Sequence, residues 1–304
     1  MSANKTLLKQ TLIYGIATVL PRVISFLLVG LHTDLMPKVA YGEITILLAY
    51  MIFFNVILSY GMETAFFRFY HKEENKNEVI STATVSIFWS TVLFLCITLL
   101  FQKTLAGLLN VDKEYVNYAI WILAFDALVI IPFSKLRAEQ KAIKYSVLKI
   151  SNVIINMLLN VFLLAILPKL AHANPQGFWS TFYFEEYQIG YVFLANLIAS
   201  LFTFVLFMPH YFQPNWIFNK ELWQKMIQYS WPILFAGLAF GINEHLDKIL
   251  LSEWLDPSVA KAAVGAYSAC YKIGLFMVLF RTAYTLGIEP FFFFFAGNAN
   301  APQT

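Results

Sequence analysis

Four ionisable residues lie inside one apolar stretch, the segment GINEHLDKILL at 241–251. They are Glu244, His245, Asp247 and Lys248. Charged groups in a membrane helix are costly, so they indicate a water-filled path, a binding pocket or a buried ion pair. Glu244 and Lys248 stand four residues apart, in the favourable order for an ion pair on one helix face. That pair leaves Asp247 and His245 unexplained, so we expect this helix to face a cavity.

Further cations accompany other apolar segments. Arg22 follows Pro21 near the middle of the first segment, with no acid of that segment within four residues. Lys272 lies about nine residues into the last segment, near mid-depth at about 1.5 Å per residue, and Arg68 ends the second segment. Such cations could bind an anionic substrate in an enclosed site of low dielectric constant. The cationic candidates are Arg22, Lys272, Lys248, Arg68 and Arg281.

Carboxylates in the same segments could couple the protein to a proton or sodium gradient. The candidates are Glu63, Asp126, Glu244 and Asp247. Glu63 and Arg68 are five residues apart, which is not an ideal helical pair, so Glu63 is available for another partner. Asp126 could instead have a structural role, as the buried acid that pairs with Arg22. The spacing does not choose among the four acids.

Two stripes at helical spacing have both a structural and a functional interpretation. Asn152, Asn156 and Asn160 recur every four residues, which favours hydrogen bonding between helices over a substrate track. A second stripe consists of Tyr267, Tyr271, Gly274 and Arg281. This stripe could stack on sugars, but helix packing is the simpler interpretation.

The elements that carry these residues are membrane helices. The chain has 304 residues, of which 59% are hydrophobic and 13% charged, against about 25% charged in an ordinary soluble domain. Crossing the hydrocarbon takes roughly 20 apolar residues. Eight segments qualify, at about 11–32, 42–67, 80–101, 116–134, 147–167, 188–209, 226–252 and 263–289. The first has no small-residue cleavage site, so we expect a membrane helix and not a signal peptide.

Composition and motifs disfavour several other classes. The two cysteines, Cys96 and Cys270, exclude a disulfide framework, and the absence of CxxC and HExxH leaves a metal site unsupported. We therefore expect no cofactor beyond a coupling ion. A net charge of +3 is too small to indicate nucleic-acid binding.

The distribution of Lys and Arg predicts the orientation. With the N-terminus inside, the connectors on the inner side carry most of these residues, and those on the outer side carry only Lys38, Lys103, Lys113, Lys169 and Lys261. An even number of helices then returns the chain to the inside. The longest connector, at about 168–187, is aromatic and is expected to lie along the outer membrane interface.

A weak internal repeat divides the chain. Each copy has a proline-containing span, then a glycine near the start of the next helix, then a glutamate near the inner end of that helix. The glycines are Gly42 and Gly265, and the glutamates are Glu63 and Glu289. Six helices separate the copies, as in transporters built from parallel repeats. We therefore predict a first six-helix lobe at 1–210 and, at 211–304, the start of a second lobe, apparently truncated after the eighth helix.

Several stretches, in a fixed order, carry a family resemblance. They are LPRVISFLLVGLHTD, YGMETAFFRFY, RAEQKAIKYSVLKISNVIINMLLNVF, YSWPILFAGLAFGINEHLDKILL and GAYSACYKIG. Together they resemble the polysaccharide-export branch of the multidrug/oligosaccharidyl-lipid/polysaccharide exporter superfamily, the flippases of O-antigen type. Members usually have twelve to fourteen helices in two lobes, so ending after eight would put autonomous transport in doubt.

The resemblance implies a fold and a function. It implies an all-α integral membrane protein with a fold like that of multidrug and toxin extruders. The expected cargo is a polyprenyl-pyrophosphate-linked oligosaccharide, moved across the bacterial inner membrane for lipopolysaccharide or cell-surface polysaccharide assembly. Membrane lipids and other polysaccharide-assembly proteins are the expected partners, and H⁺ or Na⁺ the coupling ion.

Three alternatives remain at this point. A multidrug extruder of the same superfamily would favour acids for cationic drugs, and Arg22 and Lys272 argue against it. A membrane enzyme of O-antigen assembly would present a large outer loop bearing Arg and His. The longest outer connector instead offers only Lys169, His172, Glu185 and Glu186. A non-transporting scaffold is the third.

Overall fold

The computed structural model describes residues 3–212, 216–274 and 277, and within them every regular element is a helix. The predicted all-α class is therefore confirmed. The helices are α1 (Ala3–Leu35), α2 (Lys38–Ser59), α3 (Met62–Lys72), α4 (Lys76–Leu100), α5 (Gln102–Leu109), α6 (Lys113–Leu128), α7 (Ile130–Ala138), α8 (Ala142–Val161), the π-helix η1 (Phe162–Ile166), α9 (Leu167–Ala173), the 3₁₀-helix η2 (Phe178–Phe182), α10 (Gln188–Tyr211) and α11 (Lys220–Trp254). Residues 257–274 form one more helix.

Five helical stretches within the described residues are long and apolar enough to cross a membrane. They are Lys38–Lys72, Lys76–Leu100, Lys113–Ala138, Ala142–Ala173 and Gln188–Tyr211. The helices α1 and α11, with 33 and 35 residues, are also long enough to span about 30 Å of hydrocarbon. The predicted eighth span, 263–289, begins earlier, at 257, and most of its second half lies outside the described residues.

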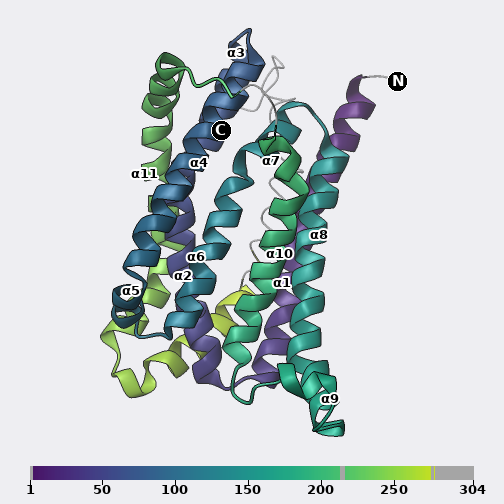
Figure 1. The fold of residues 1–304 in the computed structure, drawn as a ribbon, viewed down its shortest axis with the longest axis vertical. Helices are drawn as coiled ribbons and strands as arrows, with labels where there is room; N and C mark the ends of the chain where they lie inside the picture. Colours follow the sequence, from purple (N-terminus) through teal and green to yellow (C-terminus); the bar gives the residue numbers. More distant parts are fainter. Residues whose placement is uncertain (1–2, 213–215, 275–276, 278–304) are drawn as a thin grey trace, which may run out of the picture.

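The long helices run roughly along the vertical axis of Figure 1, so their connectors gather at two opposite ends. The start of α1, α3 and the α7–α8 connection share one end, while α5 and α9 lie at the other (Figure 1). This alternation agrees with the sidedness deduced from the basic residues. We call the two ends the N-terminal end and the far end.

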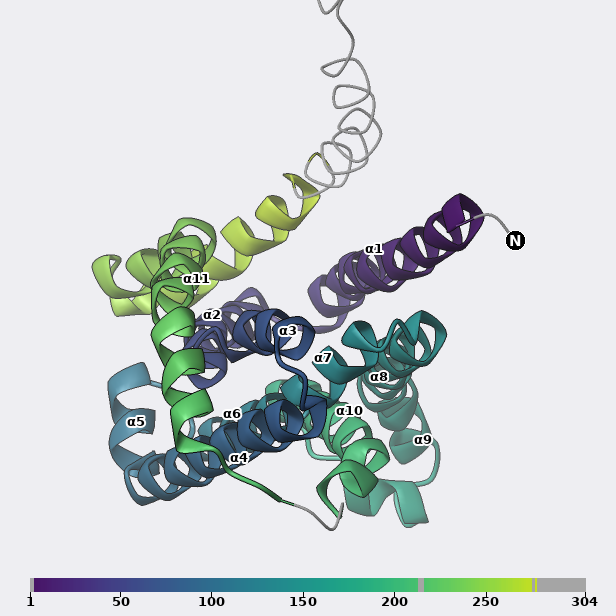
Figure 2. The ribbon, with the colours of Figure 1, turned by 90° about the horizontal axis from the view of Figure 1, so that it is seen from above.

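Seen from above, α1 and residues 257–274 lie on the same side of α2, opposite α4 (Figure 2). The helices α2, α6 and α10 pack together, α8 packs on α1 and α10, and α11 packs on α2 and α3. Buried side chains such as Leu47, Ile122 and Phe193 form the main core between α2, α6 and α10. A second core around Phe66 and Met226 joins α3 to the start of α11.

The helix boundaries have local causes. Tyr60 and Gly61 both adopt left-handed backbone conformations, with φ of 32° and 70°, and they interrupt the predicted span 42–67 between α2 and α3. A Cβ on Gly61 would lie 2.7 Å from the Ser230 carbonyl oxygen, so this break brings α3 close against α11. Asn219 caps α11, its side chain accepting a hydrogen bond from the Leu222 amide at 3.0 Å.

The helix at 257–274 crosses α2 with almost no space between the two backbones. A Cβ on Gly42 would lie 1.7 Å from the Lys261 carbonyl oxygen, which is sterically impossible without movement. Small residues allow helices in a membrane to approach this closely. The two glycines matched in the predicted repeat, Gly42 and Gly265, thus lie at one helix crossing.

Candidate functional site

Two of the predicted ion-coupling acids line one polar pocket. Glu63 and Asp126 face a space of about 380 Å³ bounded by α2, α3, α6, α7, α8 and α10. The same pocket is lined by Lys149 and by amide and hydroxyl side chains, among them Asn152 and Ser200. The tertiary structure therefore brings together two carboxylates separated by more than sixty positions.

Asp126 is held by a neighbouring helix. The Ser200 hydroxyl donates a hydrogen bond to its carboxylate, with 2.8 Å between the oxygens. Asn152 of α8 donates to the Ala199 carbonyl and the Thr203 hydroxyl, both at 2.9 Å, and so fixes the opposite wall to α10. These bonds orient the polar groups toward a common space, a preorganisation that binding sites require.

Glu63 has a cationic partner that the spacing analysis did not identify. Arg137 of α7 lies 2.5 Å from the Glu63 carboxylate, and its guanidinium is 4.7 Å from the centre of the Phe67 ring. The two charged side chains are 42% and 46% exposed, so water reaches this pair. Lys149 of α8 lines the same pocket as Asp126.

The pocket offers carboxylate, amide and hydroxyl oxygens, which suit a proton or a small hard cation. Across the described ranges, no group of three or more His, Cys, Asp and Glu residues could hold a metal ion. A cation here would therefore depend on neutral oxygens from residues such as Asn55 and Asn196.

The prediction that Lys248 pairs with Glu244 is wrong, because its acidic partner is Asp247. The Lys248 ammonium lies 3.1 Å from the Asp247 carboxylate and donates to the backbone carbonyl of Glu244 at 3.1 Å. The Glu244 carboxylate accepts from the Tyr271 hydroxyl at 3.0 Å instead. The neighbouring helix decides this, because Tyr267 also donates to Asp247, at 2.5 Å.

Tyr267 and Tyr271 of the second stripe thus pack residues 257–274 onto α11. Helix packing was the simpler of the two interpretations given above. The Tyr267 and Tyr271 rings stack at 6.1 Å, and Lys248 lies 4.0 Å from the centre of the Tyr271 ring. Lys248 is only 5% exposed, so it is a buried cation neutralised within its own cluster. Because its charge is compensated by Asp247, Lys248 would attract an anionic substrate only weakly.

Lys272 differs from Lys248 in having no acidic partner among the described residues. Its ammonium lies 5.9 Å from the centre of the Tyr41 ring, and no carboxylate of the described residues is within ion-pair distance. The side chain is partly buried, near His32 of α1 and close enough to Lys248 for the two charges to repel. Lys272 is therefore a cation in the protein interior that an anion could neutralise.

The other predicted cations are spread out. Arg22 is exposed on α1, and within the described part of the chain no acid pairs with it, so the suggested Arg22–Asp126 pair is not formed. Arg68 is also exposed and lies 4.2 Å from the centre of the Tyr229 ring of α11. Arg281 lies outside the described residues.

The asparagine stripe connects helices, as predicted. The Asn160 side-chain oxygen accepts a hydrogen bond from Nε2 of the His32 ring of α1 at 2.9 Å, and Asn152 bonds to α10 as described above. Asn160 also donates to the Asn156 side chain at 2.6 Å. Both Asn160 and His32 are buried, so α1 is tied to α8 by a hydrogen bond shielded from water.

An ion pair at the far end was not predicted. Lys261 donates to the Glu43 carboxylate and to the Asn110 carbonyl, both at 2.9 Å. It thereby ties residues 257–274 to α2 and to the α5–α6 connection, next to the crossing of Gly42 and Gly265. Glu43 follows Gly42 directly in the sequence. Its position next to this glycine was the only feature of the sequence that could have indicated the ion pair.

The fold and these polar clusters define an all-helical membrane protein with charged groups inside its helix bundle. The chain matches the model of the polysaccharide biosynthesis protein family over residues 7–286, and it belongs to that family. The resemblance stated above is confirmed at this level. No curated protein and no solved structure gives a significant match to the chain.

Proposed function

We propose that this protein is a flippase, not an enzyme, for polyprenyl-pyrophosphate-linked oligosaccharide in the bacterial inner membrane. The observation that supports it best is Lys272, a partly buried cation without a carboxylate partner among the described residues. A pyrophosphate head group carries charge that hydrocarbon cannot solvate, and an ammonium in a low-dielectric interior offsets it strongly. Membership of a polysaccharide biosynthesis family supports a glycan as the rest of the cargo.

Transport would proceed by alternating access of two lobes. The Gly42–Gly265 crossing and the Glu43–Lys261 pair would act as the closed gate at the far end, which the orientation rule assigns to the outside. In this state the cargo would enter from the inside, with its polyprenyl tail remaining in the bilayer. Opening the far end requires the crossing and the ion pair to separate.

The pocket of Glu63 and Asp126 is the proposed coupling site. Protonation of a carboxylate or binding of Na⁺ there would change the charge facing Lys149. An ion drives transport only if it binds the two lobe arrangements with different affinity. The pocket spans helices on both sides of the Tyr60–Gly61 break, where a change of helix angle could alter it.

Flipping of a fluorescent polyprenyl-pyrophosphate oligosaccharide in proteoliposomes tests the proposal. We expect transport by the wild type and at least a tenfold loss in the Arg22→Ala, Lys272→Ala double variant, the size of a lost charged hydrogen bond. Lys103→Ala removes an exposed lysine of α5 and serves as the control. Passage of cationic dyes without lipid flipping would instead identify a multidrug extruder.

A further inference from the structure

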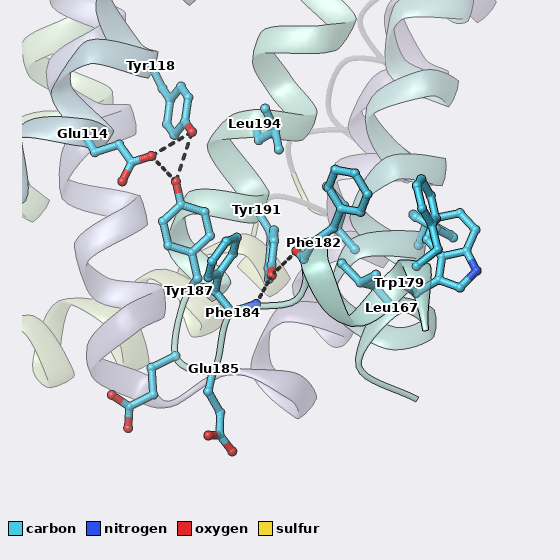
Figure 3. Close-up of a pocket in the computed structure, with 14 residues that line it drawn as sticks. Glu114, Tyr118, Leu167, Trp179, Phe182, Phe184, Glu185, Tyr187, Tyr191 and Leu194 are labelled. Carbon is cyan, nitrogen blue, oxygen red and sulfur yellow. Dashed lines mark hydrogen bonds between the residues drawn. The ribbon is translucent and has the colours of Figure 1, made fainter. Parts of the chain in front are cut away.

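A pocket of about 650 Å³ opens at the far end of the first lobe, apart from Lys272 and from the Asp126 pocket. Its walls come from the start of α6, the π-helix η1, the 3₁₀-helix η2 and the start of α10 (Figure 3). Ligand pockets commonly have volumes of about 300–1,000 Å³. The space is thus large enough for two or three sugar rings, and the cationic candidates are elsewhere.

The pocket is acidic. Glu114, Glu185 and Glu186 line it, and neither Lys nor Arg is among its lining residues. Carboxylates accept hydrogen bonds and would repel a phosphate. The chemistry therefore favours a ligand rich in hydroxyl donors and disfavours the pyrophosphate end of a lipid-linked cargo. These acids come from positions about seventy residues apart.

Tyrosine hydroxyls fix the acidic wall in place. Tyr118 donates to the Glu114 carboxylate at 2.9 Å, and Tyr187 donates to the same oxygen atom (Figure 3). Burial raises the pKa of Tyr187, and the bond to Glu114 raises it further, so this phenol remains a donor. Glu114 is held by two donors, while Glu185 points away from them at the rim (Figure 3).

Aromatic rings form the opposite wall. The Trp179 ring packs edge-on against Phe162 at 5.5 Å and Phe178 at 5.3 Å, yet 41% of Trp179 remains exposed. Tyr191 anchors this wall to α10, because its hydroxyl accepts from the Phe184 amide at 2.7 Å and donates to the Phe182 carbonyl at 3.0 Å. The exposed rings thus stand on a backbone with fixed geometry.

Two irregular backbone features border the same space. The π-helix Phe162–Ile166 interrupts the long α8–α9 helix and contributes Phe162 to the pocket; such turns are frequent at functional sites. Glu186 has a φ of 66°, an uncommon conformation for a residue other than glycine. Unusual backbone beside a pocket is typical of binding sites, where it positions side chains.

We propose that this pocket binds the neutral sugar rings of a glycan at the far end of the protein. A pyranose ring presents apolar C–H faces, which suit Trp179 and its neighbours, and an edge of hydroxyl groups, which suits Glu114. The inference rests on the proposed function for its ligand class, and it adds a glycan site separate from the phosphate-binding cation. An aromatic anchor at the membrane interface would need no carboxylate held in place by two tyrosine hydroxyls, as Glu114 is.

Saturation-transfer NMR on the full chain in nanodiscs tests the proposal. The probe is a mixture of neutral, lipid-free oligosaccharides of hexose, N-acetylhexosamine and 6-deoxyhexose units. We expect binding by the wild type and about a tenfold weaker affinity in Trp179→Ala and in Glu114→Gln, each of which removes one wall of the site. Trp231→Ala, an exposed tryptophan of α11, is the matched control. Thermal unfolding of each variant verifies that it folds.

Three results would overturn the proposal. The first is that sugars bind Trp179→Ala as tightly as the wild type. The second is that no sugar binds the wild type. The third is that the pocket binds only an organic cation such as tetraphenylphosphonium. Lipid flipping by the same preparation separates the two proposals. Flipping with sugar binding unaffected by Trp179→Ala would reject the pocket alone, and pocket-dependent sugar binding without flipping would reject the flippase alone.

Discussion

Gly42 of α2 and Gly265 of the helix at 257–274 contact each other backbone to backbone. A Cβ built on Gly265 would lie 3.0 Å from the Gly42 nitrogen, and a Cβ on Gly42 would lie 3.1 Å from the Gly265 nitrogen. Neither position has space for a side chain, so the two helices cross here at the separation of their backbones.

The glycine crossing predicts an unusual sign for a glycine-to-alanine change. Alanine normally stabilises a helix interior by about 1 kcal/mol relative to glycine. Gly42→Ala should instead destabilise by about 1–3 kcal/mol, since its methyl group would overlap the Lys261 carbonyl. Denaturant unfolding in detergent measures this. Gly30→Ala, whose Cβ meets nothing within 4 Å, should show no loss, and equal effects at both positions would contradict the close approach.

The Glu43–Lys261 pair predicts a barrier at the far end. Ser268 is only 1% exposed, so a cysteine there, with Cys96 and Cys270 replaced by serine, should react slowly with an impermeant maleimide. Glu43→Gln should raise the labelling rate about tenfold, because a charged hydrogen bond is weakened.

Reversing both charges of this pair provides the control. Glu43→Lys with Lys261→Glu should restore slow labelling only in part, since a glutamate cannot donate to the Asn110 carbonyl. Unchanged labelling in Glu43→Gln would show that the glycine crossing alone closes this end.

The polar pocket predicts which acid couples transport to an ion gradient. Asp126→Asn keeps the Ser200 hydrogen bond but removes the charge, so flipping should no longer respond to an imposed pH or Na⁺ gradient. Downhill movement of lipid should continue. Proteoliposome flipping with and without each gradient measures this, with Glu74→Gln at an exposed position as control. A gradient response retained by Asp126→Asn would leave Glu63 to be tested in the same way.

The burial of Lys248 beside Asp247 predicts a structural role for this ion pair on α11. Asp247→Asn should destabilise the protein by about 3 kcal/mol, because it leaves a buried ammonium without its counter-charge. Adding Lys248→Met should recover most of this loss in thermal unfolding. Recovery of stability with flipping intact would assign the pair to packing, whereas lost flipping in the stable double variant would place Lys248 in the transport path.

Much of the fold could be predicted from the sequence because bilayer thickness and backbone hydrogen bonding leave few choices. Runs of about 20 apolar residues, separated by polar connectors, located α4 and α10 within a few residues, whereas α11 begins earlier than its predicted span, at Lys220. The Tyr60–Gly61 break was missed because apolar residues continue through it, and only contact with α11 requires it. The asparagine stripe was interpreted correctly because lipid offers an amide no partner.

The sites divide in the same way. The sequence by itself determined that charged groups lie inside the bundle, since a charge within an apolar run is evident from the run alone. Only the tertiary structure decided the partners: Lys248 with Asp247, Glu63 with Arg137, Glu114 with two tyrosines, and Lys272 with no carboxylate within the described residues. Spacing specifies neighbours on one helix, whereas each of these environments is completed by another helix, whose position depends on the packing of the whole bundle.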